Sequence, residues 1–445
     1  MNRTSDFLAS QRASMRFVLG LVALATLGAL PVQPASAATR TVTTCADGGI
    51  GSLRDAARLA VSGDSIDMTR LACGRILLSR GAITLPQNDL VLLGPGRLAL
   101  TIDGGNLGRI FDHSGTGTLR LYRLSVANGR YANVSATGGC INSNGNVELI
   151  RSRVHRCETI PCCALEPGNA GGGIYARGRV LLSESSVFYS KAIGGPGGGV
   201  AGGDVTLYRS QVYNNEGGEG GGVSASRSLS VTYSLVHNNR GSDGGGLSGR
   251  GTTRMVVNKS TISNNWATGF GGGIQGGGSE ETWIINSTIS GNSGYYTGAV
   301  YALPYTFIVG STIAFNETRR PDECQGALSI LRDSLLVSSI VAQNTCPTGQ
   351  PVDVDVFDSF GTGALSGGHN LIGFAEGPVP GDTIFGNPML GPLADNGGPT
   401  RTHMPASNSL AIDRGSNLLA QQFDQRGPNF FRVKGGLPDI GAVER

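Results

Sequence analysis

The 445-residue sequence predicts an all-β fold in which the chain winds as a parallel β-helix. One observation is a repeat, because a glycine triplet followed by an apolar run recurs at intervals of 26, 23, 24 and 27 residues. A period of about 20 to 50 residues is typical of stacked folds. The triplets end at Gly173, Gly199, Gly222, Gly246 and Gly273.

The second observation is the pattern inside each unit. Short β-branched runs alternate apolar and polar residues, as in Val205-Thr206-Leu207, and a period of two is typical of strands. The third is that glycine clusters separate these runs and leave no stretch of the repeat long enough for a helix. Each unit of roughly 25 residues is therefore predicted to form one coil of a solenoid.

A recurring Ser-x-Val/Ile-x-x-Asn frame predicts columns of side chains along the stack. The apolar column is expected to point inward, because strand side chains alternate between faces. Asparagines recur once per coil from Asn215 to Asn344. Equivalent residues on neighbouring coils lie ~4.8 Å apart, so their side-chain amides are expected to hydrogen-bond along the stack. A serine column runs from Ser152 to Ser339. The apolar column predicts nine coils, at Val126, Val154, Val187, Val212, Val236, Ile262, Ile289, Ile313 and Val341.

Composition and the N-terminal sequence indicate the class of protein and whether it is exported from the cell. Charged residues make up only 15% of a chain that has 71 glycines, which suits a β-solenoid better than a helical enzyme domain. Residues 1–37 are predicted to be a signal peptide, because arginines precede an apolar run at 17–30 and Ala35-Ser36-Ala37 supplies a small-residue cleavage site. The run is shorter than the ~20 residues of a membrane span. Removing this segment lowers the net charge from +3 to +1, and a nearly neutral chain without a basic run does not favour nucleic-acid binding.

The mature chain is predicted to have three parts. Residues 38–120 form an N-terminal cap and the first coils, 121–345 the glycine-rich coils, and 346–445 a proline-rich C-terminal segment. The cap is expected to contain a short helix that begins with the capping-box pattern at Ser52. Its apolar face would cover the open end of the solenoid. Strands are expected at 75–78, 90–93 and 98–102.

The eight cysteines, all in the predicted mature chain, indicate disulfides in an exported protein. Cys45 and Cys73 flank the predicted helix and are expected to pair. Cys324 and Cys346 are about one coil apart and could bridge neighbouring coils. The other four could pair in three ways; their spacing matches no usual zinc pattern. They are Cys140, Cys157, Cys162 and Cys163.

Several motifs resemble a bacterial family of exported proteins. CADGGIGSLRDAARLA near the N-terminus, and GHNLIG, NPMLGPLADNGGPTRTH, FDQRG and PDIGAVE near the C-terminus, are similar to proteins with a CSLREA-type N-terminus and a choice-of-anchor Q C-terminal domain. The repeats resemble those of polymorphic outer membrane proteins. The resemblance implies a right-handed β-helix at the cell surface. This chain reads GSLRDAA at the N-terminal motif and ends at Arg445, so release or periplasmic residence is expected instead of anchoring.

Similar β-helices include pectate lyases and galacturonases, although a shared fold does not establish activity. Glu219 and Asp243 each precede a glycine triplet, 24 residues apart, and Glu216 and Arg240 lie on the same turns. Two stacked carboxylates beside an arginine could hold calcium or act as acid and base. The favoured interpretation is solvated turn charges with a local Arg240–Asp243 contact.

A second acidic group consists of Asp353, Asp355 and Asp358, of which the first two would share a strand face. It is a candidate calcium site, although no cofactor is the favoured expectation.

A strip of rings is the candidate ligand-binding surface. The outward positions beside the inward valines are His155, Phe188, Tyr213 and His237, one on each of four successive coils. Such a strip could stack on sugar rings, or it could be a ladder that only stabilises the sheet.

We therefore expect an exported, non-enzymatic β-helix protein, adhesin-like, whose sheet face contacts polysaccharide or the surface of a host or neighbouring cell. The alternatives are a polysaccharide lyase or hydrolase and a structural component of the envelope.

Overall fold

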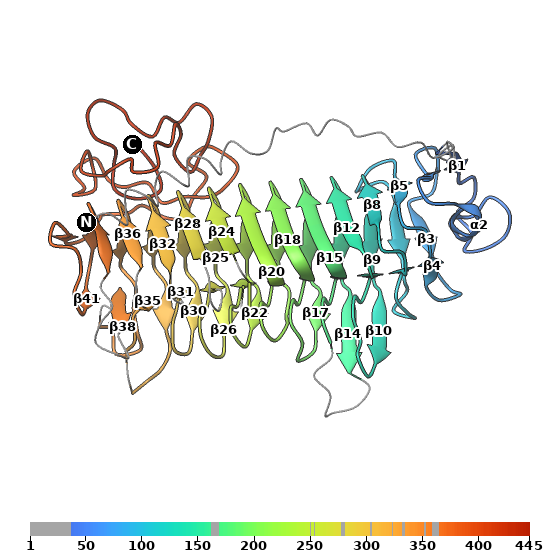
Figure 1. The fold of residues 1–445 in the computed structure, drawn as a ribbon, viewed down its shortest axis with the longest axis horizontal. Helices are drawn as coiled ribbons and strands as arrows, with labels where there is room; N and C mark the ends of the chain where they lie inside the picture. Colours follow the sequence, from blue (N-terminus) through green and yellow to red (C-terminus); the bar gives the residue numbers. More distant parts are fainter. Residues whose placement is uncertain are drawn as a thin grey trace, which may run out of the picture. The chain divides into compact units, whose positions relative to one another are not determined.

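The computed structural model describes residues 37–445 except 162–168, 250, 253, 277–280, 303–304, 323, 332–333, 351–352 and 358–364. Residues 37–445 form one compact unit. Of the predicted signal peptide, only residue 37 is described. The prediction of a parallel β-helix with a short N-terminal helix is confirmed, because the strands of successive coils pair in parallel and stack in order along the unit (Figure 1).

One strand from each coil joins a 13-stranded sheet among the described residues, here called sheet B. Its strands are short, and each contributes one inward side chain between two outward ones. In order they are β3 (Arg75–Leu77), β6 (Thr101–Asp103), β9 (Ser125–Ala127), β13 (Arg153–His155), β16 (Ser186–Phe188), β19 (Gln211–Tyr213), β21 (Leu235–His237), β25 (Thr261–Ser263), β29 (Thr288–Ser290), β33 (Thr312–Ala314), β37 (Ile340–Ala342), β40 (Leu371–Ile372) and β42 (Ile384–Phe385).

The rest of each coil supplies the opposite wall, a sheet of 22 strands among the described residues, here called sheet A. These are β1 (Thr39–Thr41), β2 (Ser65–Asp67), β4 (Ile83–Leu85), β5 (Leu90–Leu93), β7 (Phe111–His113), β8 (Thr118–Tyr122), β11 (Ile141–Ser143), β12 (Asn146–Ile150), β15 (Ile174–Ser183), β18 (Val200–Tyr208), β20 (Val223–Thr232), β23 (Leu247–Ser248), β24 (Arg254–Asn258), β27 (Ile274–Gln275), β28 (Glu281–Ile285), β31 (Val300–Ala302), β32 (Thr306–Val309), β35 (Leu328–Leu331), β36 (Leu335–Val337), β38 (Val354–Phe357), β39 (Ser366–Gly368) and β41 (Ala375–Glu376).

Short strands after sheet B form two further ladders. They are β10 (Arg130–Asn133), β14 (Glu158–Pro161) and β17 (Lys191–Ala192) in one, and β22 (Arg240–Gly241), β26 (Trp266–Ala267), β30 (Ser293–Gly294) and β34 (Glu317–Thr318) in the other.

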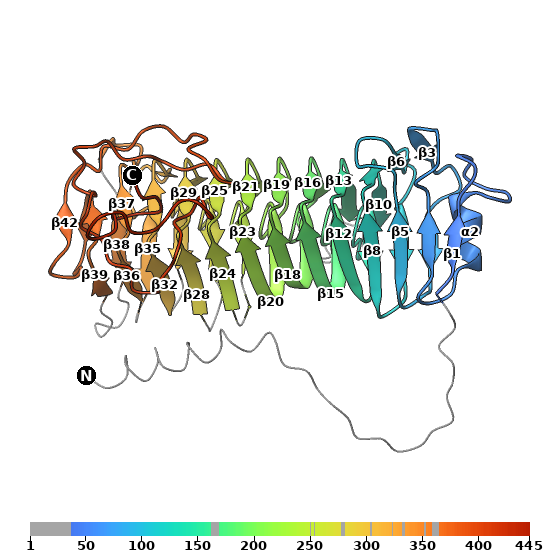
Figure 2. The ribbon, with the colours of Figure 1, turned by 90° about the horizontal axis from the view of Figure 1, so that it is seen from above.

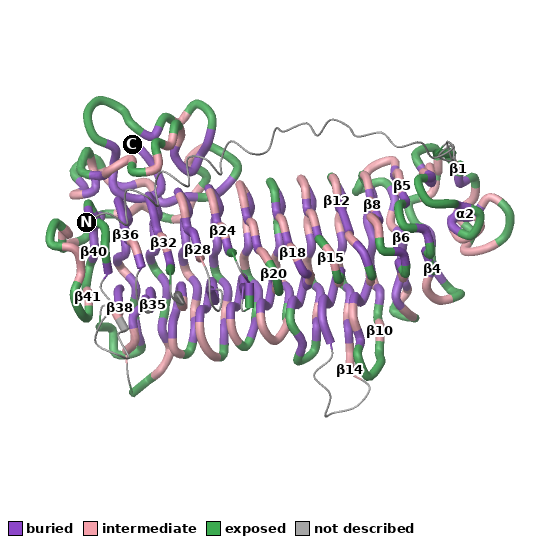
Figure 3. The backbone as a smooth tube through the Cα atoms, viewed as in Figure 1, coloured by how far each residue is buried: buried purple, intermediate pink, exposed green. Residues whose placement is uncertain are grey.

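The predicted apolar column is the core of sheet B. Its nine members pair coil to coil in register, and all are fully buried. Burying one Val or Ile side chain contributes about 1.5–3 kcal/mol, so the column is a large part of the stabilisation. Figure 3 shows the same alternation of buried and exposed backbone in coil after coil.

The asparagine column forms the predicted ladder. Each side-chain amide from Asn215 to Asn316 donates to the amide oxygen one coil on, at 2.9–3.0 Å. The ladder ends at Asp353, whose Oδ1 accepts from Asn344 Nδ2 at 2.7 Å. Serine hydroxyls form a second ladder, in which each hydroxyl oxygen accepts a hydrogen bond from the backbone N–H of the serine one coil away. Ser210 N, for example, donates to Ser234 Oγ at 3.0 Å. Both ladders satisfy buried backbone groups at corners where no strand pairing is possible.

The N-terminal helix is α2 (Leu53–Leu59), capped by Ser52, whose hydroxyl accepts from Asp55 N at 3.1 Å. The predicted apolar face is buried, and Gln87 donates to the last helix carbonyls. The strand predicted at 98–102 is only partly correct. Residues 97–99 form a turn and β6 begins at Thr101, because Gly94-Pro95-Gly96 starts a turn closed by the bond from Ala99 N to Gly96 O at 2.9 Å.

The coils continue to β42, past the end predicted at residue 345, so the C-terminal segment outside the solenoid is residues 387–445. It packs on the outer face of sheet B at one end of the solenoid, over β29, β33 and β37 (Figure 2). There the outward side chains are small: Thr288 donates to Gln425 at 2.6 Å, and Ser290 bonds His403 at 2.8 Å. This contact explains why the ring strip gives way to serine after His237.

Three disulfides join cysteines among the described residues: Cys45–Cys73, Cys140–Cys157 and Cys324–Cys346. The first and third join the pairs expected from the sequence, and the second belongs to one of the three pairings left open for the clustered cysteines; Cys162 and Cys163 lie outside the described residues. Three disulfides are typical of an extracytoplasmic protein. Among the described residues, no helix has the length and apolarity to cross a membrane.

Candidate functional site

Two of the turn residues proposed as catalytic belong to a charge ladder. Arg130, Glu158, Lys191, Glu216 and Arg240 stand in one column, in register, with alternating sign. Lys191 Nζ lies 3.1 Å from Glu216 Oε1. Opposite charges on adjacent strands stabilise a sheet, so the ladder accounts for both residues without a substrate.

The remaining contacts of this group are also structural. The Arg240 guanidinium lies over the Trp266 ring, 4.1 Å from its centroid. Glu219 and Asp243 are neighbours across coils, as expected, and Asp243 Oδ1 accepts from Phe270 N at 2.8 Å. The expected Arg240–Asp243 contact is not found, since no ion pair joins them among the described residues; Arg240 stacks on Trp266 instead.

Only two members of the proposed calcium group, Asp353 and Asp355, lie among the described residues. Asp353 precedes β38, is buried and ends the asparagine ladder, and burial raises its pKa to about 6. Asp355 lies within β38 and lines a separate cavity of about 230 Å³ with Glu376 and Phe374. The two carboxylates thus have different surroundings, and Asp358 lies outside the described residues.

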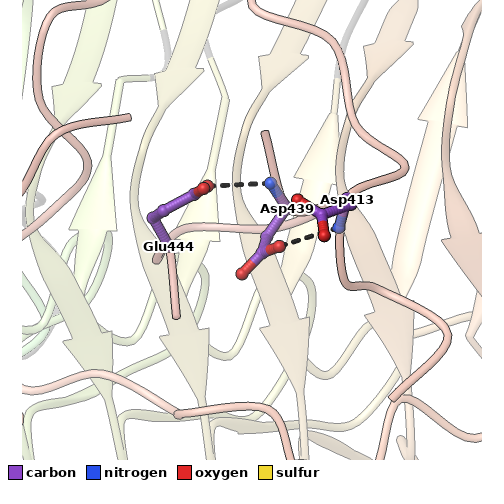
Figure 4. A group of neighbouring side chains, drawn as sticks. All are labelled: Asp413, Asp439 and Glu444. Carbon is purple, nitrogen blue, oxygen red and sulfur yellow. Dashed lines mark hydrogen bonds between the residues drawn. The ribbon is translucent and has the colours of Figure 1, made fainter. Parts of the chain in front are cut away.

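Three other carboxylates do lie together in the C-terminal segment: Asp413, Asp439 and Glu444 (Figure 4). Two of them accept hydrogen bonds from backbone N–H groups within the cluster. Asp439 Oδ1 accepts from Asp413 N at 2.9 Å, and Glu444 Oε2 accepts from Asp439 N at 2.8 Å. The buried Arg432 is close enough to interact electrostatically with Asp439 and Glu444. This arrangement ties the motif PDIGAVE to the rest of the segment, and its hydrogen bonds indicate a structural role.

The ring strip is a ladder of stacked faces. His155, Phe188, Tyr213 and His237 stack with centroids 4.8, 4.8 and 5.0 Å apart and planes within 8° of parallel. Both faces of Phe188 and Tyr213 are covered by neighbouring rings. A sugar ring therefore cannot stack on them, and the structural interpretation of the strip is the better one.

Beside this ladder lies a groove of about 660 Å³ that sequence reasoning did not find. It runs along the corner where the chain passes from sheet A to sheet B, and the loop before β6 forms one wall. Five arginines and one glutamate line it, so its local excess of four positive charges exceeds the +3 of the whole chain. The charged residues are Arg97, Arg123, Arg151, Arg153, Arg209 and Glu184, and Leu98, Ser185, Ser186, Gln211 and Tyr213 complete the lining.

Most of this charge is not neutralised. Arg97, Arg123 and Arg153 donate to the carbonyl oxygens of Glu184, Pro95 and Arg97, at 2.9, 3.2 and 2.8 Å. Carbonyls accept hydrogen bonds without cancelling charge. Among the described residues, only Arg151 of the five pairs with a carboxylate, that of Glu184. The groove can therefore receive further anionic groups.

The backbone at this corner is unusual for the residues it carries. Arg123, Arg151, Glu184 and Arg209 directly follow β8, β12, β15 and β18 and have φ values of 47–53°. The left-handed region costs a non-glycine residue about 1–2 kcal/mol. At the next corner, after sheet B, asparagine fills four of the equivalent left-handed positions: Asn128, Asn214, Asn238 and Asn264.

Where the C-terminal segment covers the first corner, its residues are Lys259, Asn286, Gly310 and Ser338. The long charged side chains of Arg123, Arg151, Glu184 and Arg209 occupy this corner on the four coils beside the groove.

The groove shifts the pKa of its neighbours. Burial, with Arg153 and Arg156 nearby, lowers the pKa of His155 to about 4, so the ring is neutral at physiological pH. The Arg151 guanidinium lowers the pKa of Glu184, with further help from Arg209 and Arg97. Desolvation lowers the pKa of Arg153, with Arg97 adding to it.

Comparisons with known proteins assign no family to the chain. No known family matches the chain, and no curated protein matches it. Among solved structures, the chain is similar to the crystal structure of a pectate lyase, Pel9A, at 14% identity and a TM-score of 0.39, over 92% of this chain and 97% of that one. This likeness does not bear on the activity of this chain.

Proposed function

We propose that the protein is an extracytoplasmic, non-enzymatic β-helix protein that binds acidic polysaccharides in the arginine groove. The observation that carries the proposal is the set of five arginines that line one groove, four of them without a carboxylate partner among the described residues. Guanidinium groups bind carboxylates and sulfates through paired hydrogen bonds, and they retain their charge at any physiological pH.

The compartment supports a polysaccharide ligand. The disulfides indicate an oxidising environment. The predicted signal peptide and the resemblance to exported β-helix proteins of the CSLREA and choice-of-anchor Q type favour secretion or residence in the cell envelope. Acidic polymers at such surfaces are polysaccharides, which fits the adhesin-like role expected from the sequence.

A non-catalytic role is favoured over a lyase or hydrolase. Of the candidate acids at the turns, Glu216 is accounted for by the charge ladder and Asp243 by its hydrogen bond from Phe270 N. The one acid in the groove, Glu184, is held by Arg151. A purely structural envelope role would leave the concentration of charge at the groove without an explanation.

The test is equilibrium binding of the purified protein to polygalacturonate, alginate and neutral dextran. We expect binding to the two acidic polymers and none to dextran. The Arg209→Asn variant should bind about tenfold more weakly, because one charge-assisted contact is lost. Arg156→Asn is the matched control, since Arg156 is exposed and also left-handed, at φ 55°, but lies outside the groove.

Absorbance of unsaturated uronides is followed in the same samples. Their formation would show lyase activity and overturn the non-catalytic role. Equal binding by the wild type and Arg209→Asn would show that the groove is not the binding site.

A further inference from the structure

The groove contains one carboxylate, and its position suggests a role in ligand choice. Glu184 stands in the corner column between Arg151 and Arg209, one coil from each. Its Oε2 accepts from Arg151 Nε at 2.9 Å and its Oε1 from Arg151 Nη2 at 3.4 Å. The two planar groups thus meet in the paired geometry of an arginine and a carboxylate.

This pair differs from a buried structural ion pair. The side chains of Arg151 and Glu184 are 63% and 44% exposed, so both can exchange partners with solvent or a ligand. An exposed pair contributes little to stability. Asparagine would fit the left-handed backbone of residue 184 at lower conformational cost, so folding alone does not account for a glutamate there.

Resting on the proposed function, we infer that Glu184 is a specificity-determining residue whose carboxylate occupies the place of a ligand carboxylate, and that the groove takes polysaccharides of the uronate class. A uronate carboxylate has the same planar shape and charge as the Glu184 side chain. On binding, a ligand carboxylate replaces the Glu184 carboxylate on Arg151. Arg123 and Arg209, on the coils that flank the Arg151–Glu184 pair, receive the neighbouring charges of the polymer.

This exchange makes Glu184 a competitor of the ligand. Removing its charge frees Arg151 and removes repulsion of the polymer, so affinity for a uronate polymer should rise. If Glu184 instead served to orient Arg151 for the ligand, removing the charge would lower affinity. The two roles therefore predict changes of opposite sign in the affinity for a uronate polymer.

The experiment compares the wild type, Glu184→Gln and Glu184→Asn by titration calorimetry with polygalacturonate, with dextran sulfate as a charged polymer without carboxylates, and with dextran. Both variants should bind polygalacturonate roughly two- to fivefold more tightly, and the wild type should prefer polygalacturonate to dextran sulfate. Glu184→Asn also suits the backbone, and thermal unfolding verifies that both variants fold. Glu158→Gln, at the exposed Arg130–Glu158 pair outside the groove, is the matched control and should bind as the wild type does.

Unchanged or weaker binding by both Glu184 variants overturns the exchange, and a preference for dextran sulfate overturns the uronate class. Either result leaves the proposed function standing as long as the wild type binds acidic polymers and Arg209→Asn weakens that binding. Failure of the wild type to bind any charged polymer would instead overturn the proposed function itself.

Discussion

At the scale of single residues, burial beside positive charge sets the chemistry of the groove. His155 lies at the end of the ring ladder, its Nε2 3.0 Å from Ser125 Oγ, and its pKa falls to about 4. The folded protein keeps this ring neutral at pH values where an unfolded chain binds a proton, near the ordinary histidine pKa of about 6.5. Folding stability should therefore fall as the pH drops from 6.5 towards 4.

The first prediction concerns His155→Phe, which preserves the stacked ring and removes the titrating group. The wild type should lose about 1–2 kcal/mol more unfolding free energy than the variant between pH 7 and pH 4.5, after allowance for the partial exposure of the ring. Denaturant unfolding at several pH values measures the difference. Asp353 has a raised pKa of about 6, so its contribution to stability increases as the pH falls. Both proteins share this contribution, and it cancels in the comparison between them. Parallel pH profiles would contradict the prediction.

At the scale of elements, the ladders explain how such short strands hold together. Asn265 donates to Val236 O and Asn292 Oδ1, at 3.0 and 2.9 Å, and its Oδ1 accepts from Asn239 N at 2.9 Å. Because the amide is fully buried, its loss leaves backbone groups without partners.

The second prediction is that Asn265→Ala lowers the free energy of unfolding by roughly 2–4 kcal/mol. Asn264→Gly, at the adjacent exposed left-handed position, should change it by less than about 1 kcal/mol, because glycine suits that backbone. Urea unfolding compares the two variants. Equal losses would show that the ladder does not contribute the stability assigned to it.

At the scale of the molecule, the C-terminal segment divides sheet B into a covered and an open half. Arg432 is 2% exposed and donates to Asp439 O at 2.9 Å, near the carboxylates of Glu444, Asp424 and Asp439. It adds positive charge beside these carboxylates where water is excluded, although Asp424 forms its own ion pair with Arg426. Burial also raises the pKa of Glu444, so acid relieves part of that charge.

The third prediction is that Arg432→Met destabilises the protein by about 3 kcal/mol at pH 7, since the buried carboxylates lose their counter-charge. The loss should shrink as the pH falls and Glu444 takes up a proton. Thermal unfolding at pH 7 and pH 5 measures both effects, with the exposed Arg414→Met as control. A loss that does not depend on pH would exclude the electrostatic explanation.

Much of the fold could be predicted from the sequence, because it repeats. The inward valines, the asparagines and the α2 cap each follow from local periodicity or a capping pattern. The ring strip was also placed correctly, but its stacked faces could not be foreseen, since alternation gives the side of a strand and not the angle of a ring. Asp353 was assigned to a strand face, whereas it ends the asparagine ladder.

The groove could not be found in this way. Its five arginines come from four separate stretches between residues 97 and 209, and the local sequence around each is ordinary. Residues 98–100 were assigned to a strand, which hid the loop that forms one wall. The net charge near zero also concealed a local excess. One signal was available: Arg123, Arg151 and Arg209 each directly precede a member of the repeating Ser frame or its equivalent, so aligning that position would have shown the column.

The central claim is that the arginine groove holds an acidic polysaccharide by charge. The salt dependence of binding to polygalacturonate tests it most directly, with the wild type, Arg209→Asn and Arg156→Asn measured between about 50 and 200 mM salt. The account predicts that affinity falls steeply with salt, and that Arg209→Asn reduces the slope of log K against log salt by about one while Arg156→Asn leaves it unchanged. Equal slopes for all three proteins would contradict it.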